Sequence, residues 1–137
     1  MENKPQYIII HHSASIRDNT NHKMIDRWHE QKGFPKSELG YFVGYHYVIT
    51  ANGLVKQTRN DNESGAHAKT DDGMNYKSIG ICLTGNFETE QPSSWQITSL
   101  LELIEKLPPA GSARFGLLVL SVELTVKPET LLAPPLI

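Results

Sequence analysis

Two histidines follow three isoleucines in Tyr7-Ile8-Ile9-Ile10-His11-His12-Ser13. β-Branched residues at successive positions predict a strand over Tyr7–His11 that is buried on both faces of a sheet. In open α/β sheets, ligands bind where such strands end. Because side chains alternate along a strand, at most one of His11 and His12 enters a shared site, and the other is expected to be a buried, hydrogen-bonded histidine.

The composition limits what this chain can be. Its 137 residues, 39% of them hydrophobic, suit one domain with one core. A formal charge of -2 and a pI near 6.3 argue against nucleic acid as a partner. The sequence shows no signal peptide and no apolar stretch long enough for a membrane span, so we expect a protein made in the cytoplasm. The single cysteine, Cys82, excludes an internal disulfide.

Strands and helices alternate along the rest of the chain. Apolar residues at helical spacing (Met24, Ile25 and Trp28) and a Gly33-x-Pro35 stop signal predict a helix over residues 21–32. Asn52-Gly53 predicts the tight turn of a β-hairpin. A capping box at Ser93–Gln96 begins a second helix, which ends near Leu107 and buries one face. The expected further strands are Tyr45–Thr50, Leu54–Thr58, Ser78–Thr84 and a candidate at Leu117–Leu120.

A long polar segment, residues 59–77, separates two of these strands. Its composition predicts a surface loop that does not pack, and its length favours a role such as one wall of a groove. His67 lies there among small residues, and a place in a groove and a place on the surface stay open for it.

Two other histidines have structural interpretations. His29 lies near a helix end, where a cationic ring is favoured by the helix dipole. His46 alternates with Tyr45 and Tyr47, so the two tyrosines are predicted to share one face of the sheet and His46 to occupy the other.

Metal-assisted hydrolysis is the reaction class that the strand-end histidine favours most. Ser13 has no Gly-x-Ser-x-Gly context, and the chain has no glycine-rich phosphate loop. Cys82 lies between Ile81 and Leu83, where a core residue is expected rather than a nucleophile. Glycosidase chemistry by paired carboxylates stays open, although no acidic residue stands out.

Six motifs occur in a fixed order along the chain. They are Ile10-His11-His12-Ser13-Ala14, Trp28-His29, Gly33-Phe34, Gly44-Tyr45-His46-Tyr47-Val48-Ile49, Gly65-Ala66-His67-Ala68, and Asn75-x-x-Ser78-Ile79-Gly80-Ile81-Cys82-Leu83-x-Gly85-Asn86-Phe87. Together they resemble the type 2 N-acetylmuramoyl-L-alanine amidases, which include phage endolysins and animal peptidoglycan recognition proteins. The likeness covers roughly residues 6–107. It implies a single α/β domain with a mixed central β-sheet flanked by helices.

The resemblance also implies an activity and its residues. The activity is zinc-dependent hydrolysis of the amide between N-acetylmuramic acid and L-alanine in peptidoglycan. By their positions in the motifs, His11 is the expected zinc ligand, Tyr45 the catalytic residue, and His29, His67 and Asn75 the residues that line the peptidoglycan groove. We expect a monomer that acts at the bacterial cell wall after release from the cytoplasm, without nucleic acid or membrane partners.

The C-terminal quarter departs from this pattern. Family members carry a second histidine in a Gly-His-x-Glu/Asp motif and then a Cys or Asp before Pro-Gly, whereas Val119–Leu124 and Glu129–Pro135 contain neither ligand. We therefore divide the chain into an amidase-like part, residues 1–107, and a divergent segment of the same domain, residues 108–137. Because a catalytic zinc needs three protein ligands, we expect weak zinc binding and little amidase activity.

Two alternatives to an active amidase stay open. The first is a peptidoglycan-binding module without catalysis, and the second is a cytosolic domain with no role at the cell wall.

Overall fold

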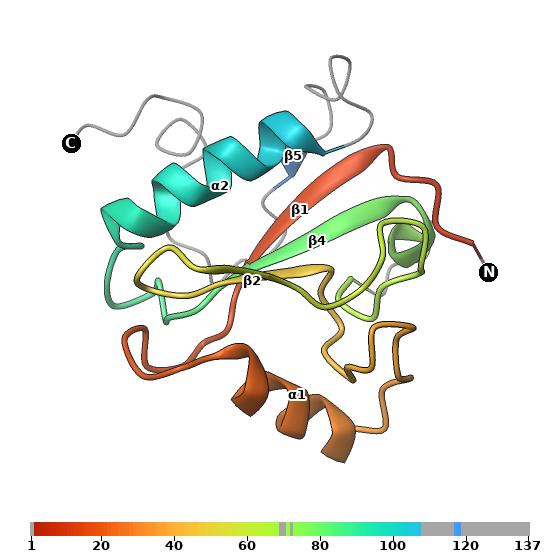
Figure 1. Ribbon diagram of the computed structural model, residues 1–137, viewed down its shortest axis with the longest axis horizontal. Helices are drawn as coiled ribbons and strands as arrows, with labels where there is room; N and C mark the ends of the chain where they lie inside the picture. The colour runs from red at the N-terminus through yellow and green to blue at the C-terminus, as the bar shows by residue number, and fades with distance from the viewer. Residues whose placement is uncertain (1, 69–70, 72, 108–116, 119–137) are drawn as a thin grey trace.

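A computed structural model describes residues 2–68, 71, 73–107 and 117–118 (Figure 1). The helices and strands are, in order, β1 (Tyr7–His12), α1 (His22–Gln31), β2 (Tyr47–Ile49), β3 (Val55–Gln57), the 3₁₀ helix η1 (Met74–Tyr76), β4 (Ser78–Leu83), α2 (Ser94–Lys106) and β5 (Leu117–Leu118). Every strand and helix expected from the sequence is present, most of them one or two residues shorter at an end.

The strands form one mixed sheet in the order β3-β2-β4-β1-β5. All neighbours run parallel except β2 and β3, which form the antiparallel hairpin. In Figure 1, α1 and α2 lie on opposite sides of this sheet, so that the domain has three layers. The expected fold class, an α/β domain with a mixed sheet between helices, is confirmed.

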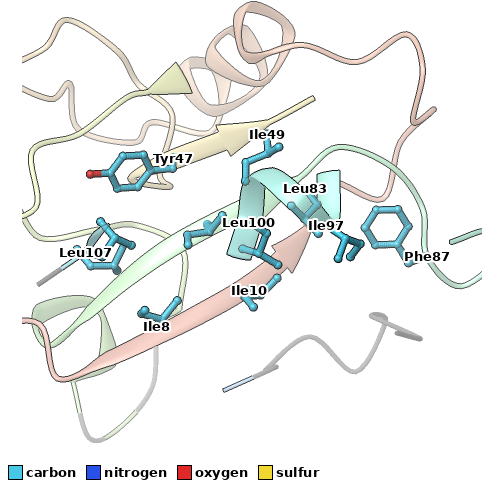
Figure 2. Close-up of a cluster of buried hydrophobic side chains, with 11 residues drawn as sticks. Ile8, Ile10, Tyr47, Ile49, Leu83, Phe87, Ile97, Leu100 and Leu107 are labelled. Atoms are coloured by element: carbon cyan, nitrogen blue, oxygen red, sulfur yellow. The ribbon is translucent and has the colours of Figure 1, made fainter. Parts of the chain in front are cut away.

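The face of the sheet under α2 carries the larger apolar core (Figure 2). Ile8 and Ile10 of β1 point into it, and Ile97 and Leu100 of α2 close it from above. The helix begins as the sequence predicts, because Ser93 Oγ accepts a hydrogen bond from Gln96 N and Gln96 Oε1 accepts one from Ser93 N. Burial of these side chains is the main source of stability on this side.

The face under α1 has a smaller apolar cluster, formed by Ile25, Val43, Val48 and Cys82. The expected helix is confirmed, with Asn21 as its N-cap, but its predicted buried face is partly wrong. α1 buries Ile25 and His29, which are four residues apart, while Trp28 is 36% exposed. A histidine therefore takes a core position that apolar periodicity alone assigns to tryptophan.

The start of the hairpin also differs from the expectation. β2 begins at Tyr47 because His46 O accepts hydrogen bonds from the N–H groups of both Thr58 and Arg59, which interrupts regular pairing. As a result, Tyr45 packs against the α1-side cluster, whereas Tyr47 belongs to the core under α2. The prediction that the two tyrosines share a face is therefore wrong.

The polar segment 59–77 is not the unpacked loop that its composition predicts. Ala68 and Met74 are buried against Ile9, and η1 forms just before β4. Ala68 and Met74 are enough to seat the segment on the sheet, which brings His67 to the end of β1.

The C-terminal expectations are tested only in part. The expected strand at Leu117–Leu120 is present as β5 over Leu117–Leu118. Its last two residues, the division of the chain after residue 107, and the stretches Val119–Leu124 and Glu129–Pro135 lie outside the described residues. Among the helices of the described part, none has the length and apolar character that crossing a membrane requires.

Candidate functional site

His11 and His12 leave the end of β1 toward opposite faces, as strand alternation predicts. His12 is buried, its Nδ1 accepts a hydrogen bond from Phe87 N at 2.9 Å, and its ring lies 5.8 Å from the Phe87 ring. His11 is half-buried on the α1 side, with its ring 5.2 Å from that of Tyr45. The expectation that the two side chains separate and that one is a buried, hydrogen-bonded histidine is confirmed.

His67 reaches His11 from the segment before β4. The distance between His11 Nε2 and His67 Nδ1 is 2.9 Å, and the two rings meet edge to face with centroids 5.0 Å apart. Gly80 of β4 makes this approach possible, since a Cβ there would lie 2.6 Å from the His67 ring. Burial, followed by the nearby rings of His11 and His46, holds the pKa of His67 well below its usual value. His67 is thus a neutral ring at neutral pH.

Asn75 holds the backbone of this segment in place. Its Oδ1 accepts hydrogen bonds from His67 N at 3.0 Å and from Ala68 N at 2.9 Å. The motif residue therefore positions His67, and contact of Asn75 with peptidoglycan stays a prediction.

Tyr45 lies between two histidines. Its ring centroid is 5.2 Å from that of His11 and 5.5 Å from that of His29. Its side chain packs against the cluster that contains Cys82. Burial, reinforced by Cys82, raises the pKa of Tyr45 well above its usual value, so the phenol remains protonated and can act as a donor.

His29 of α1 completes the row of rings. Its Nδ1 accepts a hydrogen bond from Gly44 N at 2.8 Å, and its ring lies 4.6 Å from Phe34. Burial, with smaller contributions from Lys32 and Arg59, lowers the pKa of His29 to about 4. The interpretation of His29 as a cation stabilised by the helix dipole is therefore wrong, because the desolvation of the charged ring outweighs the dipole.

Two residues near His67 were not among the predicted site residues. His46 lies with its ring 5.7 Å from His67, donates from Nε2 to Glu63 O at 2.7 Å, and accepts at Nδ1 from Gly80 N at 3.0 Å. Ser78 Oγ lies 3.3 Å from His67 Nε2. The sequence did carry one signal for the contact between β4 and His67. Gly80 lies inside an apolar strand, and a glycine at such a position often marks the close approach of another group.

The described side chains do not complete a zinc site of the catalytic kind, which needs three protein ligands. Among residues 2–68, 71, 73–107 and 117–118, no group of three His, Cys, Asp or Glu side chains is placed to hold a metal ion. Burial raises the pKa of Cys82 to about 12, so its thiol stays protonated. Beyond residue 107 the sequence contains no histidine or cysteine. His11 lies next to the phenol of Tyr45, where its imidazole can act as a single metal ligand or exchange a hydrogen bond.

Comparison with known proteins shows the family to which the chain belongs. The profile of the Amidase_2 family, described as N-acetylmuramoyl-L-alanine amidase, matches residues 1–113. The chain belongs to this amidase family. It is similar to peptidoglycan-recognition protein SC2 of Drosophila melanogaster, with 32% identity over 117 residues that cover 85% of this chain and 62% of the relative. It is also similar to the endolysin of Escherichia phage T7, with 35% identity over 82 residues that cover 59% of this chain and 48% of the endolysin.

Solved structures give the same fold. The N-acetylmuramoyl-L-alanine amidase LysC from Clostridium intestinale has a TM-score of 0.64 and 32% identity, over 75% of this chain and 62% of that protein. PGRP-SA of Apis mellifera has a TM-score of 0.62 and 28% identity, over 73% of this chain and 59% of that protein. This chain thus spans less than two thirds of the length of the relatives named here.

Proposed function

We propose that this chain acts on bacterial peptidoglycan through the site built around His11. The reaction to which such a site belongs is zinc-dependent hydrolysis of the amide between N-acetylmuramic acid and L-alanine, with Tyr45 as the catalytic residue. His29, His67 and Asn75 belong to the surface that binds the substrate. In this proposal the chain retains little of the hydrolytic activity, because His11 is its one ligand of the expected zinc set.

A single observation carries the proposal. Three segments far apart in the sequence, ending β1, preceding β2 and preceding β4, bring His11, Tyr45 and His67 together on the α1 side of the sheet. These are motif residues of a family to which the chain belongs. Neutral imidazoles and a protonated phenol suit the recognition of amide and hydroxyl groups, which peptidoglycan presents in number.

Peptidoglycan binding without catalysis is the second candidate. The lack of a three-ligand metal group among the described side chains favours it. A groove with one imidazole ligand can still hold a glycopeptide by hydrogen bonds, whereas one histidine does not retain zinc at physiological concentrations.

Three measurements on the same purified chain test the proposal. Co-sedimentation with insoluble peptidoglycan tests recognition, zinc content after dialysis tests the metal, and release of peptide from a muramoyl-dipeptide tests hydrolysis. We expect sedimentation, less than stoichiometric zinc, and slow or undetectable turnover. Stoichiometric zinc with ready turnover would instead make the chain a competent amidase, and a failure to sediment would remove the cell wall as its target.

A matched pair of histidine variants assigns the result to the site. His11→Ala removes the proposed ligand, and His22→Ala removes a half-buried histidine of α1 whose ring contacts Tyr41 outside the His11 cluster. We expect His11→Ala to weaken sedimentation at least about tenfold, the loss typical of a central binding residue. Equal loss in both variants would contradict a site centred on His11.

The place of action follows from the same proposal. A chain made in the cytoplasm meets peptidoglycan only after release, so we propose that it acts at the cell wall after release. We also propose that it acts there as a monomer. Detection of the chain in the cell-wall fraction only after lysis begins would support this order of events, and its presence there in intact, growing cells would contradict it.

A further inference from the structure

A cavity of about 500 Å³ lies between the loop that precedes α1 and the tip of the β2–β3 hairpin. The loop contributes residues 18–21 to its walls, and the hairpin contributes residues 50–52 and Leu54. In Figure 1 these two segments lie at the same end of the sheet. The volume falls within the range of about 300–1,000 Å³ that is usual for small-molecule sites.

This cavity is separate from the His11 cluster but lies at the same edge of the sheet. His11 of β1 and Val48 of β2 both pair with Cys82 of β4, and Thr50 at the cavity follows Val48 by two residues. From strand spacing and rise, Thr50 is on the order of 12 Å from His11. Asn21, the N-cap of α1, also lines the cavity, so it opens next to the helix that covers the His11 face.

Three asparagine amides at the cavity retain hydrogen-bonding groups that no described residue uses. The side chain of Asn19 makes no hydrogen bond within the part of the chain that the structure describes. Asn21 Oδ1 accepts from Met24 N at 3.0 Å and Asn52 Oδ1 accepts from Thr50 Oγ1 at 2.6 Å, so their NH₂ groups remain as donors. The cavity thus offers several donors and one complete amide to a ligand.

A carboxylate and an exposed leucine complete the lining. Asp18 Oδ1 accepts from Arg17 Nε at 2.8 Å, which leaves Oδ2 as an acceptor. Leu54 is 59% exposed and provides an apolar surface. Among the described residues that line the cavity, none is a lysine or arginine. This chemistry suits a neutral ligand with hydroxyl and amide groups better than a phosphate.

A second cavity shows the contrast. It is lined by Glu63, Arg59 and neighbouring residues, and its charged groups hold the loops together. The two carboxylate oxygens of Glu63 accept from Glu38 N at 2.8 Å and Asn60 N at 2.7 Å, while Arg59 Nη2 donates to Pro35 O at 2.7 Å. These groups serve the fold, whereas the asparagine amides of the first cavity are available.

Both walls of the first cavity are held in place by hydrogen bonds. Thr20 Oγ1 donates to Ile16 O at 2.6 Å within the loop. On the hairpin side, Ser93 Oγ at the start of α2 donates to Ala51 O at 2.6 Å. A site whose walls are fixed before binding loses less conformational entropy when a ligand enters.

We propose that this cavity binds an acetamido sugar of a peptidoglycan glycan strand, further along the strand than the muramic unit at the His11 site. The inference rests on the proposed function in taking peptidoglycan as the ligand, and it adds a place for the glycan. The asparagine amides bind the acetamido group and hydroxyls, Asp18 Oδ2 accepts from a hydroxyl, and Leu54 packs against the C–H face of the ring.

NMR titration of the full chain tests the proposal. The probe is a peptide-free tetrasaccharide of alternating N-acetylglucosamine and N-acetylmuramic acid, added to ¹⁵N-labelled protein. We expect the side-chain amide signals of Asn19 and Asn52 to shift with saturation. A glucose tetrasaccharide, which lacks acetamido groups, should bind more weakly. Equal binding of the two sugars would contradict recognition of the acetamido group, and unchanged asparagine signals would contradict the site itself.

Matched asparagine variants locate the binding. Asn19→Ala removes the amide that no described residue uses, and Asn62→Ala removes an exposed amide at the second cavity. We expect Asn19→Ala to raise the Kd for the tetrasaccharide about fivefold, the effect of one lost hydrogen bond, and Asn62→Ala to leave it unchanged. Equal Kd values in the two variants would place the sugar elsewhere.

A leucine pair gives an independent check. Leu54→Ala shortens the apolar wall, and Leu39→Ala shortens a leucine that is 41% exposed and does not line the cavity. The Kd should rise at least about threefold in Leu54→Ala alone. An unchanged Kd in Leu54→Ala would contradict the contact with the sugar ring.

Two results separate this inference from the proposed function. If the tetrasaccharide binds at the cavity while the chain fails to sediment with peptidoglycan, the proposed function is wrong and the sugar site stands. If the chain sediments and the tetrasaccharide leaves the cavity signals unchanged, the proposed function stands and this inference is wrong.

Discussion

The two faces of the sheet use buried space in different ways. Under α2, most of the buried side chains are apolar, and Ile10, Leu83 and Leu100 need no hydrogen-bonding partner. The buried polar side chains of His12 and Gln96 are each hydrogen-bonded to the backbone. Under α1, imidazole and phenol rings lie side by side, and imidazoles there are held by specific partners, such as Gly44 N for His29 and His67 for His11. The first face supplies stability by excluding water, and the second holds polar groups at the cost of their desolvation.

This difference indicates where each kind of change should act. A residue removed from the α2 side leaves a cavity, which lowers the free energy of unfolding. A residue changed on the α1 side disturbs hydrogen bonds and tautomers first, because each ring there depends on one or two specific partners.

Loss of the Leu100 side chain should have the largest effect on stability. Leu100 is fully buried in the core under α2, so Leu100→Ala should lower the free energy of unfolding by about 2–5 kcal/mol. Urea denaturation followed by circular dichroism measures this. The matched variant Leu101→Ala changes a partly buried neighbour and should cost clearly less. Equal losses would mean that the α2 side is not packed as described.

Gly80→Ala should act on the site as well as on stability. The new Cβ would lie 2.6 Å from the His67 ring and must displace it, which should cost about 1–3 kcal/mol. The hydrogen bond between His11 and His67 should be lost, which ¹H–¹⁵N NMR of the histidine rings detects as a change in the signals of both rings.

The control for Gly80→Ala is the preceding residue of the same strand. Ile79 points into the core under α2, and Ile79→Val should cost about 0.5–1.5 kcal/mol while the histidine spectrum stays unchanged. If Gly80→Ala leaves the His11 and His67 signals unchanged, the close contact between β4 and His67 is not required for the site.

His29 should make stability depend on pH. Its pKa is about 4 in the folded protein and has the ordinary value of 6.5 when unfolded, so the unfolded chain binds more protons between these values. The contribution of His29 is therefore present above pH 6.5 and is lost as the pH falls toward 4. We expect a loss on the order of 1–2 kcal/mol, after allowance for screening by the solvent.

A comparison with His29→Gln isolates this contribution. Unfolding measured at pH 7 and pH 4.5 should show a smaller decrease in the variant than in the parent chain, since the remaining histidines titrate in both. An identical decrease in the two proteins would show that His29 does not titrate with a lowered pKa.

Trp95 should have the smallest effect. It lies in the first turn of α2 and is 68% exposed, so Trp95→Gln should change the free energy of unfolding by less than about 0.5 kcal/mol. Trp95 and Leu100 lie in the same helix, so comparing Trp95→Gln with Leu100→Ala tests the effect of burial within one element. A decrease in the free energy of unfolding of more than about 1 kcal/mol is typical of a buried residue, and it would mean that Trp95 is buried in solution.

Much of the fold could be predicted because the relevant signals are local. Isoleucine repetition predicted β1, Asn52-Gly53 predicted the hairpin turn, and the Ser93 capping box predicted the start of α2. The separation of His11 from His12 also followed from alternation along one strand. Each of these depends on residues within one element, where periodicity and capping chemistry act directly.

The errors have long-range causes. Tyr45 changes face because His46 O takes two hydrogen bonds from the partner strand, and such a bend leaves no trace in an alternating pattern. His29 loses its expected charge because tertiary packing buries it. Segment 59–77 packs on the sheet through Ala68 and Met74. Two apolar residues are not enough to form a recognisable hydrophobic pattern in the sequence.

The sequence by itself determined the elements of this protein, its family motifs and the presence of an imidazole at the end of β1. Only the tertiary structure decided which partner that imidazole has. His67 and Ser78 lie 56 and 67 positions beyond His11 in the chain, and they meet it because β1 and β4 pair side by side while segment 59–77 docks over them. A hydrogen bond depends on distance and direction between atoms, and residue order fixes these only after the sheet has formed.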